Sequence, residues 1–127
     1  MSIFQRIFRD RLGSAHQPMP SIEEIIEQMQ NRDLPDVPAD HLHIFTAKDR
    51  TRRIIIRQSN SGYYTICYEQ LCLRDEEEWR HLSHLPHILP AWWEPVDSPL
   101  NTKSFYGTYE EALKEMISFT DYRQYFP

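Results

Sequence analysis

The stretch Arg52–Leu73, RRIIIRQSNSGYYTICYEQLCL, is the part of the sequence that decides the fold. Both of its ends are rich in β-branched and aromatic residues, which favour extended strands. Between them, Ser59–Gly62 contains Asn and Gly, two residues that tolerate the positive φ of a tight turn. The pattern therefore predicts an antiparallel hairpin with strands over residues 52–58 and 63–73.

The two strands of this hairpin are expected to differ in how they are covered. Ile54–Ile56 is a β-branched run, which favours a strand that is buried on both faces. In the second strand, residues of two different sets alternate, and neighbouring side chains on a strand point in opposite directions. We therefore expect two sets of side chains on opposite faces, Tyr64, Ile66 and Tyr68 on one and Tyr63, Thr65 and Cys67 on the other.

Two further segments carry the signals of a helix start. Ser21 stands three residues before Glu24, and Thr108 stands three residues before Glu111, so both pairs fit a capping box. Apolar residues at helical spacing follow each pair. We expect the last helix to begin after Thr108, and an earlier helix over about residues 22–31. The earlier helix should bury one apolar stripe, formed by Ile22, Ile25, Ile26 and Met29.

Shorter patterns complete the predicted order of elements. A strand should follow from His41, with His41 and His43 on one face, and an acidic turn at Asp75 should open a short helix that runs to about Leu85. Short strands are expected over residues 91–94 and 103–106. The whole order is typical of an α+β fold: an antiparallel sheet of about four to five strands, with helices packed mainly on one face.

The length and composition favour one folded domain. The 127 residues match the commonest domain size, and 40% hydrophobic with 13% aromatic residues excludes an intrinsically disordered chain. We expect a single domain over residues 1–127. Within it, residues 1–20 form an N-terminal amphipathic segment and linker, and residues 21–127 form the core.

Charge is distributed unevenly along the chain. The net charge is −5, and the first 58 residues hold nine Lys and Arg against eight Asp and Glu, while the rest hold five against eleven. An acidic half suits direct nucleic-acid binding poorly, because phosphates require clustered cations. It suits a basic protein partner, since complementary potentials speed encounter. Solubility alone is the alternative explanation.

The sequence predicts a cytoplasmic protein without a membrane span. No apolar stretch is long enough to cross a bilayer, and Met1–Gly13 lacks the apolar core and cleavage site of a signal peptide. Cys67 and Cys72 would lie roughly 16 Å apart in one extended strand, which is too far for a disulfide. We expect both thiols to be reduced, as is usual in the cytosol.

The N-terminal segment Ser2–Leu12 suggests an alternative function. Its apolar residues recur at helical spacing, and three arginines lie between them. A basic amphipathic helix can bind a partner, although such a terminus can also pack on its own domain or fray. The alternative hypothesis is therefore a regulatory or adaptor module that binds another protein through this helix.

Catalytic and metal-binding patterns are weak. His81, His84 and His87 are three residues apart, but Pro86 should end a helix before His87 is reached. The chain has no Cys-x-x-Cys pair, no nucleophile elbow and no glycine-rich phosphate loop. We expect no catalysis, no metal and no cofactor. A small enzyme that uses its histidines is the third hypothesis.

Acidic and aromatic residues gather in two stretches, 75–79 and 92–94. Aromatic residues anchor protein interfaces, and carboxylates beside them can receive Arg or Lys from a partner. A solvated helix start and ordinary core packing are the simpler explanations. Since Trp92 and Trp93 are neighbours on a strand, one of them should be inside and the other exposed. The predicted partner-binding residues are Asp75, Glu76, Glu77, Glu78, Trp79, Trp92, Trp93 and Glu94.

The motifs over residues 52–117 occur in a familiar order. A hairpin is followed by an acidic run, a Trp-Trp-Glu-Pro strand and a helix that contains Glu-Glu-Ala-Leu. The segments that carry these motifs are Arg53–Ile56, Gly62–Ile66, Tyr68–Leu71, Asp75–Trp79, Trp92–Pro95 and Ser104–Leu113. This order resembles small bacterial immunity proteins encoded beside polymorphic and contact-dependent toxins. The resemblance covers about half of the chain and leaves the first fifty residues out.

The resemblance implies a non-enzymatic inhibitor in competition between bacteria. Such a protein binds one cognate toxin domain and blocks its active site or substrate surface. A toxin that acts in the cytosol is most often a nuclease, whose cleft is basic. The implied partner is therefore a basic protein domain, held by an acidic and aromatic surface.

Overall fold

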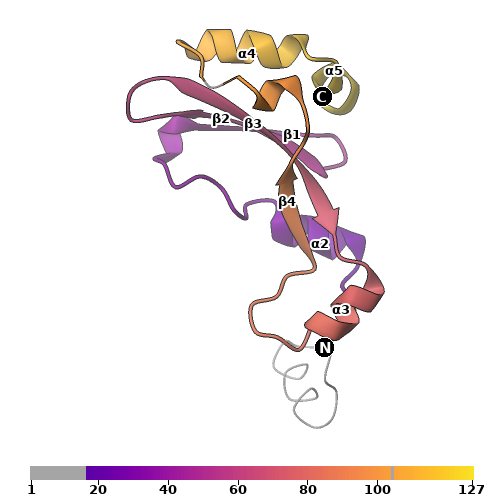
Figure 1. Cartoon of the computed structure of the whole chain (residues 1–127). Coiled ribbons are helices and arrows are strands. Elements are labelled where there is room, and N and C mark those ends of the chain that lie inside the picture. The colour runs from indigo at the N-terminus through magenta and orange to yellow at the C-terminus, as the bar shows by residue number, and fades with distance from the viewer. Residues whose placement is uncertain (1–16, 104) are drawn as a thin grey trace. The chain divides into compact units, whose positions relative to one another are not determined.

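The computed structural model describes residues 17–103 and 105–127, which form two compact units (Figure 1). The first unit combines the described residues 17–29 with Cys72–Trp92. The second unit combines Gln30–Leu71 with Trp93–Pro127. The single domain expected over residues 1–127 stays a prediction, and the amphipathic segment Ser2–Leu12 lies outside the described residues.

An antiparallel sheet with the strand order β1-β2-β3-β4 confirms the predicted α+β class. The central hairpin agrees with its prediction to within one residue, because Tyr63 precedes the second strand. Gly62 takes a φ of 91° in the hairpin turn, a conformation that favours glycine. The four strands are β1 (Leu42–Thr46), β2 (Arg52–Gln58), β3 (Tyr64–Leu73) and β4 (Ala91–Pro95).

One face of this sheet in the second unit is covered by two helices, α4 (Tyr109–Ser118) and α5 (Thr120–Tyr125) (Figure 1). Their apolar residues pack with those of β2 and β3 into one core. Apolar burial of this kind is the main favourable contribution to folding. The fully buried members of the core are Ile54, Ile56, Ile66, Tyr68, Leu100, Tyr106, Ala112, Met116 and Phe126, together with Ala47.

The opposite face of β2 is also buried, at Arg53 and Ile55. Ile54, Ile55 and Ile56 are all at most 2% exposed, although Ile55 points away from the other two. The expectation that this run is covered on both faces is therefore confirmed. Ile55 stands directly between Ile44 of β1 and Cys67 of β3 in the register of the sheet.

The C-terminal segment differs from its prediction by one extra helix. Helix α4 begins as expected, with Thr108 Oγ1 accepting from the N–H of Glu111 at 3.1 Å. Glu111 Oε2 in turn accepts from the N–H of Gly107 at 3.2 Å. At Phe119 the backbone becomes extended, with a ψ of 138°, so α4 ends there and α5 follows. The expectation that the helix after Thr108 is the last one was wrong.

The first unit contains the helices α2 (Ile22–Met29) and α3 (Glu76–Leu82). Ser21 Oγ accepts from the N–H of Glu24 at 3.2 Å, as the capping signal predicts. Ile25, Ile26 and Met29 are buried, but Ile22 is 60% exposed. The predicted apolar stripe is therefore too long by one residue, because the first residue of an eight-residue helix projects beyond its packed face.

Two smaller expectations were also inaccurate. The strand expected over residues 103–106 is reduced to one bridge, in which Tyr106 pairs with Tyr64, and Ser104 lies outside the described residues. His41 belongs to a 3₁₀ turn, Ala39–His41, and His43 to β1, so the two imidazoles do not share a strand face. Among the described residues, no helix has the length and apolar character that a membrane crossing requires.

Candidate functional site

Helix α3 carries most of the residues predicted to bind a partner. Its start is fixed by Asp75, whose carboxylate accepts from the N–H of Glu78 at 2.6 Å. Three glutamates fill the first turn, where the helix dipole favours negative charge. Asp75 therefore has a structural role as the N-cap, and it adds its charge to the same end of the helix.

The three glutamates of α3 differ in what they contact. Glu78 is ion-paired with Arg74, four residues earlier in the chain. Glu76 and Glu77 are exposed, and within the described part of the chain neither of them has an ion-pair partner. Of the three glutamates of α3, these two are therefore the ones that are exposed and have no local ion pair.

Arg74 connects α3 to the segment that leads into β4. Its Nε donates to the carbonyl of Leu89 at 2.8 Å, and its backbone N–H donates to the carbonyl of Pro90 at 2.9 Å. Its guanidinium also lies 5.3 Å from the ring centroid of Trp92, within the range of a cation–π contact. Through Arg74, the carboxylate of Glu78 and the indole of Trp92 belong to one local cluster.

The three tryptophans occupy different environments. Trp92 is 37% exposed and Trp93 is 8% exposed, so the expected alternation on this strand is confirmed. Trp79 is 5% exposed, and its Nε1 donates to the carbonyl of Gln17 at 2.9 Å. Trp79 and Trp93 are thus mainly packing residues. Trp92 is the tryptophan that a partner could contact.

The predicted site residues divide between the two units. Asp75–Trp79 and Trp92 belong to the first unit, where Arg74 connects α3 with Trp92. Trp93 and Glu94 belong to the second unit. There Trp93 stacks on the guanidinium of Arg53 at 4.1 Å. The structure therefore supports one cluster on α3 and Trp92, and a separate structural role for Trp93.

A shallow depression of about 170 Å³ adjoins this cluster in the first unit. The backbone of Gln17, in the wall of this depression, is held by two hydrogen bonds. Its N–H donates to Ser83 Oγ at 2.9 Å, and its carbonyl accepts from Trp79 Nε1. The lining residues are Gln17, Pro18, Met19, Glu76, Trp79 and Arg80. We call Glu76, Glu77, Trp92 and this depression the α3 surface.

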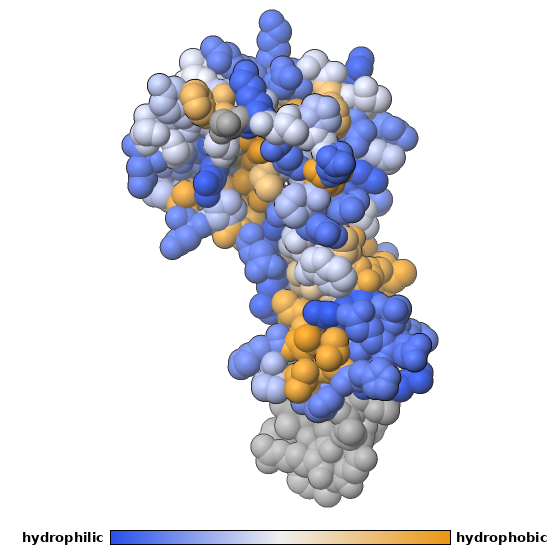
Figure 2. Space-filling view, in the orientation of Figure 1, coloured by the Kyte–Doolittle hydropathy of each residue, from blue (hydrophilic) through white to orange (hydrophobic). Residues whose placement is uncertain are grey.

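Exposed apolar side chains accompany the acidic ones in the first unit. Three of them, Ile22, Leu73 and Leu85, were not predicted as site residues and are 60%, 43% and 44% exposed. Figure 2 shows hydrophobic residues gathered directly beside hydrophilic ones over the region of α2 and α3. The sequence pattern does not show which apolar positions of these segments stay exposed, so these three residues could not be predicted as site residues.

The described part of the first unit is strongly acidic. Residues 17–29 and 72–92 contain two arginines, no lysine and seven Asp or Glu. One of the two arginines, Arg74, is already paired with Glu78. This described part of the unit therefore carries a net negative charge, which favours a basic molecule.

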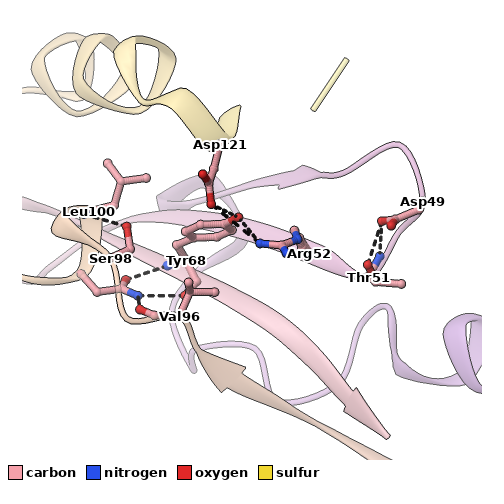
Figure 3. Close-up of polar contacts among 9 residues, drawn as sticks. Asp49, Thr51, Arg52, Tyr68, Val96, Ser98, Leu100 and Asp121 are labelled. Atoms are coloured by element: carbon pink, nitrogen blue, oxygen red, sulfur yellow. Dashed lines mark hydrogen bonds and ion pairs between the residues drawn. The ribbon is translucent and has the colours of Figure 1, made fainter. Parts of the chain in front are cut away.

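The second unit contains a polar cluster of a different kind. Tyr68 is fully buried, and its hydroxyl accepts from Arg52 Nη1 at 2.8 Å and donates to Asp121 Oδ2 at 3.0 Å (Figure 3). Arg52 also lies 4.1 Å from the ring centroid of Tyr125. Burial raises the pKa of Tyr68, so its hydroxyl stays protonated at neutral pH. The cluster fastens α5 to the sheet.

A side chain completes the hydrogen bonding of Tyr68 where β4 leaves the sheet. Asn101 Oδ1 accepts from the N–H of Tyr68 at 2.8 Å, and its Nδ2 donates to the carbonyls of Tyr68 at 2.9 Å and Val96 at 2.6 Å. Buried backbone groups need such partners. Asn101 is therefore a structural residue.

Cysteine and histidine chemistry finds no support in the local geometry. Burial, together with the nearby carboxylate of Glu69, raises the pKa of Cys67 to about 11, which leaves it as an unreactive thiol at neutral pH. Among the described residues, no three His, Cys, Asp or Glu side chains come together as a metal site. His81, His84 and His87 are all exposed. No disulfide joins Cys67 and Cys72.

Comparisons with known proteins leave the chain without a match. No protein-family model, no curated protein and no solved structure is significantly similar to it.

Proposed function

We propose that the chain is a non-enzymatic binding protein that holds a basic protein partner on its α3 surface. The observation that carries this proposal is the state of Glu76 and Glu77, which are exposed and have no ion-pair partner in the described part of the chain, in the same unit as the exposed indole of Trp92. Carboxylates beside an aromatic anchor are suited to receive Arg or Lys.

The cost of exposing these groups supports a binding role. An exposed tryptophan forfeits favourable apolar burial. A basic partner would neutralise Glu76 and Glu77 and cover Trp92 at the same time. Acidic residues placed only for solubility would not require apolar side chains beside them.

We further propose that the partner is a toxin domain and that the chain is its immunity protein. The order of motifs over residues 52–117 resembles that protein class, and the acidic first unit suits the basic cleft of a nuclease. In this proposal Glu76 and Glu77 occupy the place of two backbone phosphates, while Trp92 fills an apolar part of the cleft. An interface of this kind typically buries roughly 1,600 Å² in total.

Site-specific photo-crosslinking in the native host tests the binding surface. A photoreactive aromatic amino acid would replace Trp92 in one full-length protein and Lys48 in a control, because Lys48 is exposed and lies in the second unit. We expect one basic protein to be crosslinked at position 92 and not at position 48. Equal crosslinking at both positions, or an acidic product at position 92, would contradict the proposal.

A growth assay then tests the toxin hypothesis separately. The crosslinked partner would be expressed in cells with the wild-type chain, with Glu76→Lys/Glu77→Lys, or without the chain. We expect growth to stop without the chain, to resume with the wild type, and to stay blocked with the double variant. A partner that has no effect on growth would disprove the immunity role and leave the binding role intact.

A further inference from the structure

The face of the sheet opposite α4 and α5 is covered along only part of its length. Register partners in a sheet share a face, so the face can be followed in rows across the strands. The row of Thr46, Arg53 and Glu69 is covered, because Arg53 donates to the carbonyls of Gln30 and Asp33 at 3.3 Å and 3.4 Å. At the same covered end, the ring of Trp93 packs against the guanidinium of Arg53.

The next two rows toward the hairpin turn are only partly covered. Ile44 is 39% exposed although its partner Ile55 is buried. In the following row, Arg57 stands between Leu42 of β1 and Thr65 of β3, and its side chain is exposed. On β2 this face is therefore buried at Arg53 and Ile55 and exposed at Arg57, the position nearest the turn.

An aromatic pair ends the open part of the face. Tyr63 and Phe105 lie with ring centroids 4.7 Å apart, and they are 47% and 53% exposed. Each precedes a residue of the bridge between Tyr64 and Tyr106, and Tyr64 contacts Tyr109 of α4. Tyr63 and Phe105 consequently point to the face without helices. We call Ile44, Arg57, Tyr63 and Phe105, with Leu42 and Thr65 between them, the open sheet face.

The charge at the centre of the open sheet face is Arg57. No described carboxylate forms an ion pair with Arg57. Arg53, which lies on the same face two rows farther from the turn, is paired with Glu69 at 2.8 Å. An arginine among exposed aromatic and aliphatic side chains has the composition of an interface hot spot. Its guanidinium is suited to bind one carboxylate in a bidentate manner.

We propose that the open sheet face is a second docking surface, whose occupant is a hydrophobic protein segment that carries one Asp or Glu. The carboxylate would pair with Arg57, and apolar side chains on both sides of it would cover Ile44 and the Tyr63–Phe105 pair. Charge complementarity selects this occupant. A second copy of the chain, docked by the same face about a two-fold axis through Arg57, would bring two guanidinium groups together.

This surface differs in sign from the α3 surface, so the two proposals fail independently. The α3 surface presents carboxylates to a basic partner, while the open sheet face presents a cation to an acidic segment. Substitutions at Arg57 should therefore leave the first interaction unchanged, and substitutions at Glu76 and Glu77 should leave the second unchanged.

Selection from a library of random short peptides tests the inference on the full-length protein. We expect the wild type to enrich peptides that combine Leu, Ile or Phe with one Asp or Glu. Arg57→Glu should weaken binding of a synthesised, enriched peptide by roughly tenfold or more, and Phe105→Ala should also weaken it. Lys48→Glu is the matched control, because it makes the same charge change at another exposed position of the second unit and should have no effect.

Two further results complete the test. Thermal unfolding should be nearly unchanged in Arg57→Glu, since the side chain is exposed, so a loss of peptide binding could not be attributed to unfolding. Enriched peptides without an acidic residue, or equal binding by Arg57→Glu and the wild type, would overturn the proposal. Dimerisation of the wild type that Arg57→Glu abolishes would also overturn it, because a second copy would then be the occupant.

Discussion

Arg53 of the second unit is buried in an ion pair with Glu69, whose side chain is 14% exposed, whereas Glu76 and Glu77 of the first unit face solvent. The tryptophans follow the same division, with Trp93 packed on Arg53 and Trp92 more than a third exposed. The second unit thus uses charged and aromatic side chains to hold its sheet together. In the first unit Glu76, Glu77 and Trp92 are exposed, and this contrast with the packing around Arg53 is why we place the basic partner there.

The largest expected effect concerns the buried ion pair of the second unit. Replacing Arg53 by Met would leave the carboxylate of Glu69 without its cation, and breaking a buried pair on one side typically costs about 3–5 kcal/mol. Urea unfolding would measure this loss. The matched control is Arg57→Met, which lies on the same face and is exposed, and it should change stability by less than about 0.5 kcal/mol. Equal losses in the two variants would contradict the contrast in burial.

A smaller loss is expected when the polar cluster around Tyr68 is weakened. Tyr68→Phe removes the hydroxyl that bridges Arg52 and Asp121, at a cost of about 1–2 kcal/mol. The ion pair between Arg52 and Asp121, at 3.7 Å, would remain and limit the damage. Tyr63→Phe, at an exposed position, should have almost no effect on the unfolding midpoint. A stability loss in Tyr63→Phe as large as in Tyr68→Phe would refute this role of the cluster.

The first unit should respond locally to the loss of one hydrogen bond. Trp79→Phe removes the donor to the carbonyl of Gln17, at a cost of about 1 kcal/mol. Hydrogen exchange should speed up in α3, while the amides of β2 should keep their protection because they belong to the other unit. Trp92→Phe is the control and should leave exchange unchanged. Equal loss of protection in β2 would show that the units do not open separately.

A further expected effect is a dependence of stability on alkaline pH. Burial raises the pKa of Cys67 from 9.0 to about 11, so between these values the unfolded chain loses the thiol proton while the folded chain keeps it. This contribution to stability is complete below about pH 9 and is lost as the pH rises through about 11. The decline measured by urea unfolding should be shallower in Cys67→Ala. An identical decline in both proteins would contradict the pKa shift.

The fold could be predicted where the sequence contains local signals. The Ile54–Ile56 run and the turn at Gly62 led to the hairpin, and the Ser21 and Thr108 caps located two helix starts. The break at Phe119 could not be predicted, because an aromatic residue carries no stop signal and tertiary packing decides its conformation. The exposure of Ile22 depends in the same way on tertiary packing, because the residues packed against α2 do not reach its first residue.

The candidate site could be predicted only as a set of residue types. Alternation on a strand was enough to separate Trp92 from Trp93. The pairing of Glu78 with Arg74 joins residues four apart, a spacing that the sequence does show. The bond from Arg74 to the carbonyl of Leu89 depends on how the segment 83–90 returns to Arg74, which no spacing in the sequence reveals. The open sheet face was missed for a similar reason, since Arg53 and Arg57 look alike until the loop at Gln30–Asp33 covers only one of them.

Isothermal titration of the crosslinked partner into Glu76→Lys/Glu77→Lys tests the binding proposal most directly. The control is Glu110→Lys/Glu115→Lys, which makes the same charge change on exposed positions of α4 in the second unit. We expect the first variant to lose affinity by roughly tenfold or more, and the control to bind like the wild type with the same salt dependence. Equal affinity of the two variants would show that α3 does not hold the partner.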